Sequence, residues 1–280
     1  MWLKRRSVFV IIFNMKIEVV NVTYVFYRGT PLERIALRDI DLAIEEGECL
    51  LVAGNTGSGK STLLQIIAGL IEPTGGQVLY DGRQRKGYEV RKHIGIAFQY
   101  PEDQFFAETV FDEIAFAVRN FYPDEDPVPF VKRAMEFVGL NFDEFKDRIP
   151  FFLSGGEKRR VAIASVIVHE PDVLMLDEPL VGLDREGKGD LLKVIEKWKR
   201  LKRTVVIISH DIETVIKHVD RVVFLENGRK IFDGSREDFL REIDVHYLTT
   251  RLKTMRRLLL SGEDPFSMGD EELIDRVYRI

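Results

Sequence analysis

The sequence lacks the features that mark a secreted, membrane-spanning or nucleic-acid-binding protein. Its 280 residues include a single cysteine, Cys49, so no disulfide framework can form and a reducing cytosol is the expected compartment. No segment approaches the roughly 18 uninterrupted apolar residues of a membrane-spanning helix. The net charge of −5 gives no global basic field for nucleic acid. We therefore expect a chain that is soluble, or held at a membrane through partners, and that binds no nucleic acid.

The first residues imitate a signal peptide without completing one. Lys4, Arg5 and Arg6 precede an apolar run at 8–13 that is too short to span a bilayer, and no small-residue cleavage site comes after it. Met15 begins a cleaner strand pattern. We interpret residues 1–14 as an N-terminal extension that is either disordered or the product of a mis-assigned start codon.

A glycine-rich loop near the start is the most informative motif. Residues 54–62 read GNTGSGKST and match the phosphate-binding pattern G-x-x-x-x-G-K-[ST], between a short apolar strand expected at 49–53 and a helix expected at 63–68. The glycines let amide N–H groups point at phosphate oxygens, and the helix N-terminus and Lys60 add positive charge. Ser61 would give a hydroxyl to Mg²⁺. We predict that the chain binds a nucleoside triphosphate.

Apolar and polar residues otherwise show patterns that predict an α/β chain. Half-buried antiparallel strands are expected at 16–26 and 37–44, and further strands at 77–80 and 94–98. Two nearly all-apolar runs, typical of parallel strands covered on both faces, lie at 173–176 and 204–208. Asn227-Gly228, between strand patterns at 222–225 and 229–232, predicts a hairpin.

Helical spacing dominates two other regions. Apolar residues recur at helical spacing over 110–118 and 130–138, and Thr109 with Asp112 resembles a helix-start box, so we expect a mostly helical insert over roughly 100–165. Residues 236–280 are also expected to be mainly helical. Each motif occurs once and no internal repeat is present, which indicates one nucleotide-binding unit.

Two carboxylates end one of the apolar strands. Asp177 and Glu178 come directly after 173–176, and ligands of a parallel sheet gather at the carboxyl ends of its strands. Asp177 is therefore expected beside the phosphate loop, where it can hold Mg²⁺ or its water shell. Glu178 is then free to polarise an attacking water.

Residues 153–157, Leu-Ser-Gly-Gly-Glu, carry a second glycine motif. Ser154 and Glu157 form a capping box that predicts a helix over 158–168. Gly155 and Gly156 lower helix propensity and are not needed for capping. They fit a backbone that must approach something closely, such as a phosphate at a helix N-terminus. Both interpretations can hold at once.

Along the chain, the glycine loop, the 153–157 motif and the Asp177-Glu178 strand end follow one another in an order that resembles the ATPase subunit of an ABC (ATP-binding cassette) transporter over about residues 15–235. Three further residues also match the family: Gln99 at the mouth of the insert, Asp184 in the Gly-Leu-Asp run that follows the strand at 173–176, and His210 after the strand at 204–208. The resemblance implies a P-loop NTPase cassette with a mixed RecA-like core sheet, an antiparallel β subdomain and a helical subdomain. Glu157 is a departure, since the family more often has glutamine there.

The resemblance also implies roles for individual residues. Glu178 is the implied general base, with His210 and Lys60 as the other catalytic residues, while Ser61, Gln99 and Asp177 are implied to hold Mg²⁺. Phe26, with Tyr27 next, is the implied adenine-stacking aromatic. The residues implied to bind ATP are Phe26, Asn55, Thr56, Gly57, Ser58, Gly59, Lys60, Ser61, Thr62, Gln99, Ser154, Gly155, Gly156, Glu157 and Asp184. The 153–157 motif would complete the site of a second cassette.

Residues 98–106 and 109–113 are similar to the energy-coupling factor (ECF) ATPases. That likeness implies uptake of a vitamin or a transition-metal ion at the cytoplasmic face of the cell membrane. The implied partners are a second cassette, favoured to be a paralogue, an integral membrane coupling subunit and a small membrane substrate-binding subunit. Phe105, Phe106, Phe151 and Phe152 either line a groove for a coupling helix or form the core of the insert.

We divide the chain into a nucleotide-binding domain at 15–240 and a helical tail at 241–280. In the tail, Leu252, Met255, Leu258 and Leu259 form an apolar helix face, and we favour its packing against the partner cassette over membrane binding. The alternative function is a soluble ABC ATPase, which would be expected to carry a coiled-coil insert or two cassettes. A GTPase would need an [NT]-K-x-D motif, which we do not find.

Overall fold

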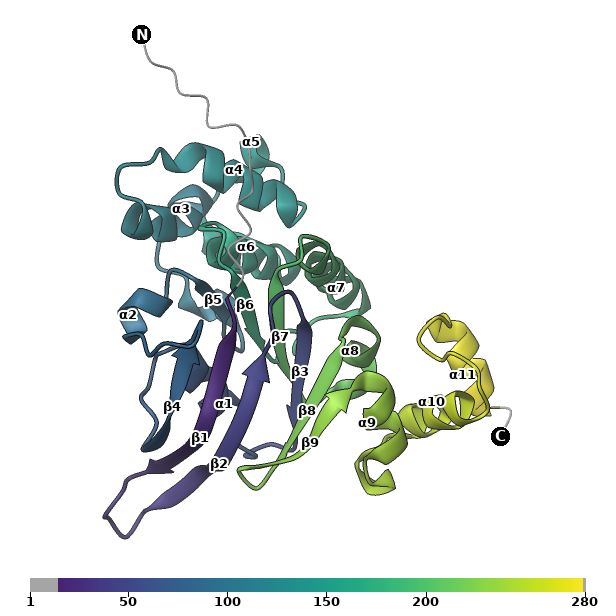
Figure 1. Cartoon of the computed structure of the whole chain (residues 1–280). Helices are drawn as coiled ribbons and strands as arrows, with labels where there is room; N and C mark the ends of the chain where they lie inside the picture. The colour runs from purple at the N-terminus through teal and green to yellow at the C-terminus, as the bar shows by residue number, and fades with distance from the viewer. Residues whose placement is uncertain (1–14, 279–280) are drawn as a thin grey trace.

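Two β-sheets and the helices packed on them make up the computed structural model, which describes residues 15–278 (Figure 1). The interpretation of residues 1–14 lies outside this range. The core sheet has six strands in the order β5-β6-β7-β3-β8-β9. Their bounds are Ile94–Ala97, Val173–Asp177, Thr204–Ser209, Cys49–Gly54, Arg221–Glu226 and Arg229–Ser235. The first five are parallel, and β9 returns antiparallel through the predicted turn at Asn227-Gly228.

A smaller antiparallel sheet lies beside the core sheet. It has the order β2-β1-β4, with β1 at Ile17–Phe26, β2 at Arg34–Ile44 and β4 at Gly75–Tyr80. Both sheets and the helical insert confirm the expected mixed core sheet, antiparallel β subdomain and helical subdomain.

Strand β3 shows why these apolar runs form buried parallel strands. Its side chains alternate between faces, so Cys49 and Leu51 join the core beneath the helical insert whereas Leu50 and Val52 join the core beneath the small sheet. All six residues of β3 are buried. A strand with no solvent face needs no polar alternation, and burial on both sides holds its C-terminal end, where the glycine loop begins.

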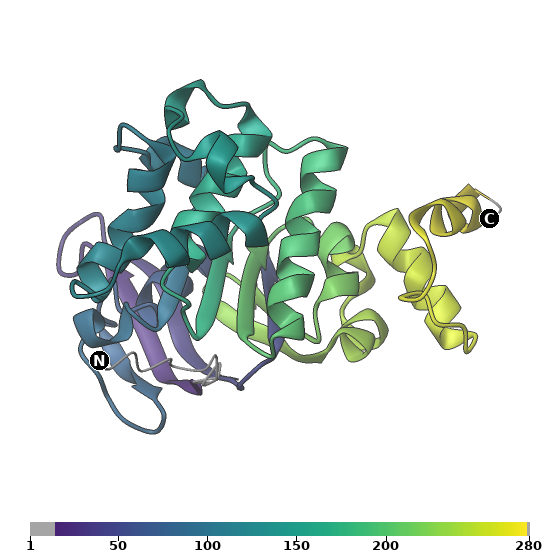
Figure 2. The same ribbon diagram turned by 90° about the horizontal axis from the view of Figure 1, so that it is seen from above.

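The helices of the insert and α7 (Arg185–Arg200) cover the core sheet on the side opposite the small sheet (Figure 2), whereas α1 (Lys60–Ile67) packs between the two sheets. The insert contains the helices η1 Pro101–Gln104, α3 Val110–Phe121, α4 Pro127–Phe137, α5 Phe142–Phe145, η2 Pro150–Phe152 and α6 Gly155–Ile167. The other helices before the tail are α2 Gly87–Val90, α8 Ile212–Val215 and η3 Ile216–His218. Thr109 accepts the amide of Asp112 at 3.0 Å, which confirms the helix-start box of α3.

The C-terminal segment forms a small helical unit in which α9 (Arg236–Glu242) packs on β8 and β9 and the later helices project to one side in Figure 1. It continues with η4 Val245–Tyr247, α10 Thr250–Leu260 and α11 Asp270–Tyr278, so the expected boundary at 240 falls inside α9. Leu252 and Met255 of α10 are fully buried within this unit. The expectation that this apolar face packs against a partner is therefore wrong, because α9 and α11 already cover it.

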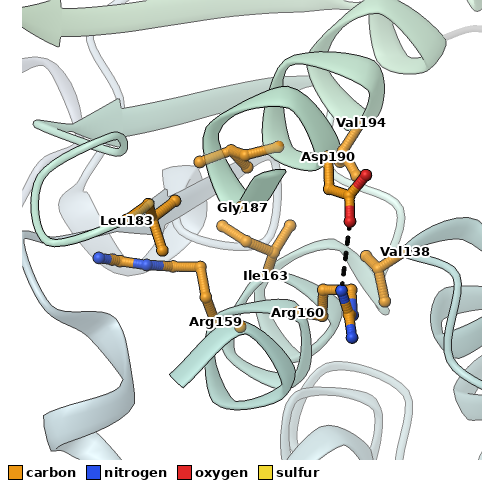
Figure 3. Close-up of a pocket in the computed structure, with 10 residues that line it drawn as sticks. Val138, Arg159, Arg160, Ile163, Leu183, Gly187, Asp190 and Val194 are labelled. Atoms are coloured by element: carbon orange, nitrogen blue, oxygen red, sulfur yellow. Dashed lines mark hydrogen bonds and ion pairs between the residues drawn. The ribbon is translucent and has the colours of Figure 1, made fainter. Parts of the chain in front are cut away.

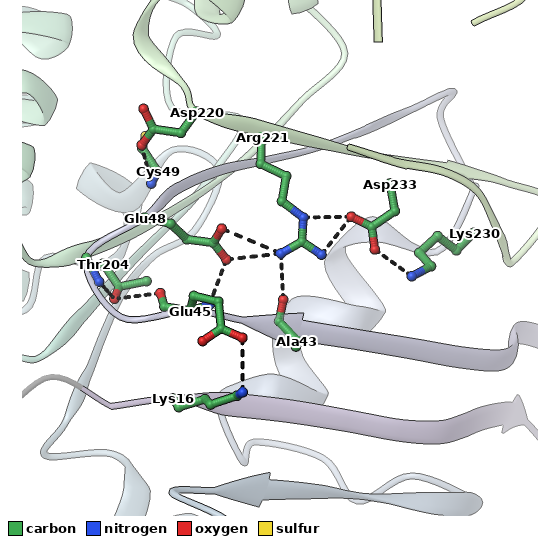
Figure 4. A network of polar contacts seen from close by, with 11 residues as sticks. Lys16, Ala43, Glu45, Glu48, Cys49, Thr204, Asp220, Arg221, Lys230 and Asp233 are labelled. Carbon is green, nitrogen blue, oxygen red and sulfur yellow. Dashed lines mark hydrogen bonds and ion pairs between the residues drawn. The ribbon is translucent and has the colours of Figure 1, made fainter. Parts of the chain in front are cut away.

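A polar network fixes the turn that leads into β3 (Figure 4). Arg221 donates to the carbonyl oxygen of Ala43 at 2.8 Å and pairs with Glu48 at 3.4 Å and Asp233 at 2.6 Å. The amide of Cys49 donates to Asp220 at 2.9 Å. One guanidinium thus joins β2, β8 and β9 at the start of the strand that presents the glycine loop.

His169, between α6 and β6, is expected to make the fold sensitive to acid. It is 5% exposed, packs on Phe121 and has no hydrogen-bond partner for either ring nitrogen within residues 15–278. Burial lowers its pKa from 6.5 to about 4. The unfolded imidazole binds a proton below pH 6.5 whereas the folded one does not, so stability is lost as the pH falls from 6.5 toward 4.

His169→Phe should remove this loss, which is on the order of 3 kcal/mol over the full interval. The measurement is the free energy of urea unfolding for both proteins between pH 7.5 and 4.5. The difference at pH 7.5 reports packing alone and is the control. A difference that does not change with pH would contradict the assignment.

Candidate functional site

The glycine loop between β3 and α1 adopts a backbone that only glycine can take at key positions. Gly54 has φ 144°, and a Cβ there would lie 2.1 Å from the carbonyl oxygen of Leu225. Gly59 has φ 102°, and its Cβ would lie 2.6 Å from the carbonyl oxygen of Ala36. Gly59 also precedes α1 without a side-chain cap, which leaves the first amides of α1 without a side-chain acceptor. These amides are the groups that would bind phosphate oxygens.

Lys60 lies folded against this loop. Its Nζ donates to the carbonyl oxygens of Gly54 at 2.8 Å and Asn55 at 3.0 Å, and the residue is 7% exposed. Burial lowers its pKa, and the carboxylates of Glu178 and Asp177 oppose that shift. The ammonium is thus held near the loop by two neutral carbonyl acceptors. A phosphate oxygen, which is charged, would be a stronger acceptor and could take their place.

Asp177, the last residue of β6, is buried at the carboxyl edge of the core sheet. Its Oδ1 has no hydrogen-bond partner among the described residues. Burial raises its pKa, and the Ser61 hydroxyl and the Lys60 ammonium oppose this rise. A buried carboxylate with a spare oxygen next to a serine hydroxyl suits a hydrated Mg²⁺. Residues 15–278 contain no cluster of three His, Cys, Asp or Glu side chains that could hold a metal by itself.

Glu178 and His210 form the second polar pair of this edge. Nδ1 of His210 lies 2.8 Å from Oε1 of Glu178, the amide of His210 donates to the same oxygen at 3.1 Å, and the Ser209 hydroxyl donates to Oε2 at 3.3 Å. Glu178 takes φ 48°, an uncommon value for a residue with a side chain. Its carboxylate is therefore held in one orientation by groups of β7 and by the residue directly after that strand.

The second glycine motif lies at the N-terminus of α6. The Ser154 hydroxyl donates to Oε2 of Glu157 at 2.7 Å, and the amide of Ser154 donates to the same oxygen at 2.8 Å, so the capping box is confirmed. A Cβ on Gly155 or Gly156 would meet nothing within 4 Å. Neither glycine has a positive φ, so nothing within the described chain requires a glycine at either position.

The structure brings some of the predicted site residues together and leaves others apart. The glycine loop, Lys60, Asp177, Glu178 and His210 gather at the carboxyl edge of the core sheet. No hydrogen bond or ion pair between described residues joins the Ser154–Glu157 turn to this group. That turn, although predicted to bind ATP, therefore makes no polar contact of this kind with the loop that would bind ATP in the same chain.

Three predicted residues occupy peripheral positions. Gln99 is exposed just after β5, and Asp184 caps α7 by accepting the amide of Gly187 at 2.8 Å. Phe26 is half-buried at the end of β1, and Tyr27 beside it is 67% exposed, so the choice of adenine-stacking aromatic stays a prediction.

The C-terminal segment contributes residues that sequence reasoning missed. A hollow of about 240 Å³ beside Gly54, Asn55 and His210 is also lined by Glu226, His246 and Tyr247. The Tyr247 hydroxyl donates to Glu226 at 2.5 Å. The sequence signal nearest to these residues was the Asn227-Gly228 hairpin, which returns the chain close to the glycine loop. It does not indicate where the residues after 235 lie.

Glu157→Gln is expected to strengthen the anion binding that the sequence predicts for the α6 N-terminus. Glutamine can keep the hydrogen bond of the capping box while removing a negative charge. In the wild type this carboxylate accepts the Ser154 hydroxyl, and it is only weakly neutralised by the guanidinium of Arg148, which lies 3.9 Å away. We expect the KM for ATP hydrolysis to fall by roughly threefold, because the variant lacks a solvent-screened carboxylate that would repel the phosphate. Steady-state kinetics of both proteins check this, and a higher KM in the variant would contradict it.

Comparison with known proteins gives consistent results. The ABC transporter family pattern matches residues 37–181. The chain is 74% identical over 263 residues to the Energy-coupling factor transporter ATP-binding protein EcfA2 of Thermotoga maritima, covering 94% of this chain and 99% of that protein. It is 45% identical to the protein of the same name from Clostridium acetobutylicum, covering 82% and 83%.

Solved structures agree with this likeness. CbiO1 from Clostridium perfringens, described as part of the ABC transporter complex cbiONQ, has a TM-score of 0.72 at 36% identity and covers 88% of this chain and 96% of that one. A dimeric ATP-binding cassette, MJ0796, bound to ADP and Pi has a TM-score of 0.70 at 26% identity and covers 79% and 98%. None of the helices described between residues 15 and 278 has the length and hydrophobicity of a membrane span.

Proposed function

Because this chain belongs to the ABC transporter family, as the ATP-hydrolysing subunit of an ECF-type importer, we propose that it holds ATP between two cassettes. One observation carries this proposal. The N-terminus of α6 exposes Ser154 and Gly155, and nothing within the described chain requires its glycines, because a Cβ on either would meet nothing within 4 Å. Each chain would then supply the glycine loop of one site and the Ser154–Gly156 turn of the other.

We assign the chemistry to the pair formed by Glu178 and His210. Glu178 would accept a proton from the attacking water, and His210 would hold the Glu178 carboxylate and reach the γ-phosphate. Lys60 and the loop amides would bind the β- and γ-phosphates. The partner's α6 N-terminus would add positive potential where charge develops in the transition state. Asp184, which now caps α7, would lie toward the partner cassette.

Mg²⁺ would be held by Ser61 and Gln99, with Asp177 acting directly or through water. It would neutralise charge between the β- and γ-phosphates. The spare Oδ1 of Asp177 supports this role.

The membrane partners would dock on an aromatic surface of the insert. Phe106 is 62% exposed, Phe151 51% and Phe152 85%, whereas Phe105 is buried. Glu113 accepts the amides of Phe106 and Ala107 at 3.0 and 2.9 Å and so holds this loop in place. Phe105 therefore belongs to the core of the insert, and the other three support a groove for a helix of a membrane coupling subunit.

We propose that the chain works at the cytoplasmic face of the cell membrane with a paralogous cassette, a coupling subunit and a small substrate-binding subunit. The imported solute would be a vitamin or a transition-metal ion, recognised by that small subunit. A soluble ABC ATPase is not favoured, because the curated relatives above are named as transporter subunits.

The test is purification of the tagged chain from detergent-solubilised membranes of its own organism, with identification of the proteins bound to it. Recovery of a second cassette together with small integral membrane proteins is expected. Recovery from the soluble fraction alone would contradict the importer.

A matched pair of variants sharpens this test. Phe151→Ser with Phe152→Ser should lose the membrane proteins and keep the second cassette. Leu32→Ser, which changes a similarly exposed apolar residue in the β1–β2 turn, should keep both. Retention of the membrane proteins by the variant with Phe151→Ser and Phe152→Ser would show that the aromatic surface is not the docking site.

A further inference from the structure

Arg159 is a buried cation that has no part in the roles proposed above. It lies in the first turns of α6, five residues after Ser154, and is only 3% exposed. A buried guanidinium is costly unless its donors find acceptors, so the positions of its partners carry information. Figure 3 shows Arg159 and its neighbour Arg160 leaving α6 in different directions, with Arg160 directed to Asp190 of α7.

The first partner of Arg159 is the loop after the catalytic carboxylate. Its Nη2 donates to the carbonyl oxygen of Val181 at 2.9 Å. This loop runs from Glu178 to Asp184 and consists of tight turns, in which the amide of Val181 donates to the carbonyl oxygen of Glu178 at 3.2 Å. Arg159 therefore ties the middle of a short segment that has Glu178 at one end and Asp184 at the other.

The second partner lies in the segment after Gln99. Nη1 of Arg159 lies 3.3 Å from Oε2 of Glu102 in η1, and the two side chains are 4% and 18% exposed. Tyr100 of the same segment packs on the loop directly, since a Cβ on Gly182 would lie 3.2 Å from its ring. The guanidinium of Arg159 thus contacts both the 100–102 segment and the Val181–Gly182 turn, and these two segments also contact each other.

From this geometry we infer that Arg159 is a positioning residue that sets the loop from Glu178 to Asp184 according to the position of the segment after Gln99. The guanidinium is planar and can hold the Glu102 carboxylate and the Val181 carbonyl at the same time. A displacement of η1 moves the guanidinium and hence the turn that begins at Glu178. The inference rests on the proposed role of Glu178 as the base.

Loss of this link should change turnover more than nucleotide binding. The partners of Arg159 are Val181 and Glu102, neither of which belongs to the glycine loop, so ATP affinity has no reason to change. Glu178 and Asp184, however, lie within three residues of Val181, and small misplacements of catalytic groups cost about 10²-fold in rate.

The experiment compares variants of this chain in the complex with its partner cassette and membrane subunits, prepared by the purification proposed above. Arg159→Gln should lower kcat for ATP hydrolysis by at least about tenfold while KM changes by less than about twofold. Arg159→Lys, which keeps the charge but lacks the planar fork of the guanidinium, should recover part of the loss. Glu102→Gln combined with Arg159→Gln should be no slower than Arg159→Gln alone, because both break one linkage.

Arg203→Gln is the matched control. Arg203 also carries a buried guanidinium, 7% exposed, and it donates to the carbonyl oxygens of Glu170 at 2.6 Å and Pro171 at 2.7 Å. These two residues precede β6, whereas the Val181 partner of Arg159 follows β6. It should lower the melting temperature as much as Arg159→Gln does while kcat stays at the wild-type value. Equal loss of kcat in both variants, or wild-type kcat in Arg159→Gln, would overturn the inference.

Glu178→Gln in the same complex separates the two proposals. If Glu178→Gln is inactive and Arg159→Gln keeps wild-type kcat, the role of Arg159 fails and the proposed base stands. If Glu178→Gln hydrolyses ATP like the wild type, the proposed base fails whatever Arg159 does.

Discussion

Glu178→Gln is expected to lower kcat for ATP hydrolysis on the order of 10³-fold, because a positioned general base contributes about 10²–10⁴-fold to such a reaction. Glutamine has nearly the shape of glutamate and can still accept the amide of His210, which donates to Oε1 at 3.1 Å. It cannot take a proton from water at neutral pH. ATP binding should persist, so the variant should retain ATP that the wild-type protein would hydrolyse.

The measurement combines steady-state turnover in the complex with the amount of ATP that remains bound after gel filtration. Glu196→Gln is the matched control, since Glu196 pairs with His218 at 3.0 Å just as Glu178 pairs with His210 at 2.8 Å, but away from the glycine loop. It should keep wild-type turnover. Wild-type turnover in Glu178→Gln would remove Glu178 from the role of base.

Local sequence patterns were sufficient for the parts of the fold that depend on neighbouring residues. The glycine loop requires glycine at 54 and 59 because a side chain there would meet main-chain oxygens, so the pattern itself encodes the backbone. The same holds for the capping box of α6 and the turn at Asn227-Gly228. Each of these signals involves residues within a few positions of one another.

Contacts between distant segments could not be predicted in this way. Arg159 meets Val181 and Glu102 from 22 and 57 positions away, and sequence shows a charged residue on a helix without saying that it is buried. The apolar face of α10 illustrates the opposite error. Its spacing predicted an apolar surface correctly, but only the fold could show that α9 and α11 cover it.

Exposure divided a set of aromatic residues that the sequence presented as equivalent. Phe105 and Phe106 are neighbours of the same type, yet Phe105 is 7% exposed and Phe106 62%. The difference arises because Glu113 accepts the amides of Phe106 and Ala107 and so turns the chain at this point. A side chain on α3 thus decides which ring enters the core.

Gly156→Asp is expected to abolish ATP hydrolysis by the cassette pair while leaving the folded chain at least as stable. A carboxylate in the first turn of a helix interacts favourably with its N-terminus, by about 0.3–1 kcal/mol, and a Cβ at Gly156 would meet nothing within 4 Å. Misfolding therefore cannot explain a loss of activity. In the proposed pair of cassettes, the same carboxylate would stand where the γ-phosphate of the partner-bound ATP would approach. Two negative charges in close proximity repel strongly once water is excluded.

Gly156→Asn separates charge from size, because asparagine has the same shape and no charge. We expect hydrolysis to fall more in the aspartate variant than in the asparagine variant, and ATP affinity at the chain's own glycine loop to stay unchanged in both. The checks are ATP turnover in the complex, equilibrium binding of a fluorescent ATP analogue to the isolated chain, and thermal unfolding. If the aspartate variant hydrolyses ATP normally, or if it loses binding at its own loop, the N-terminus of α6 does not complete a partner's site.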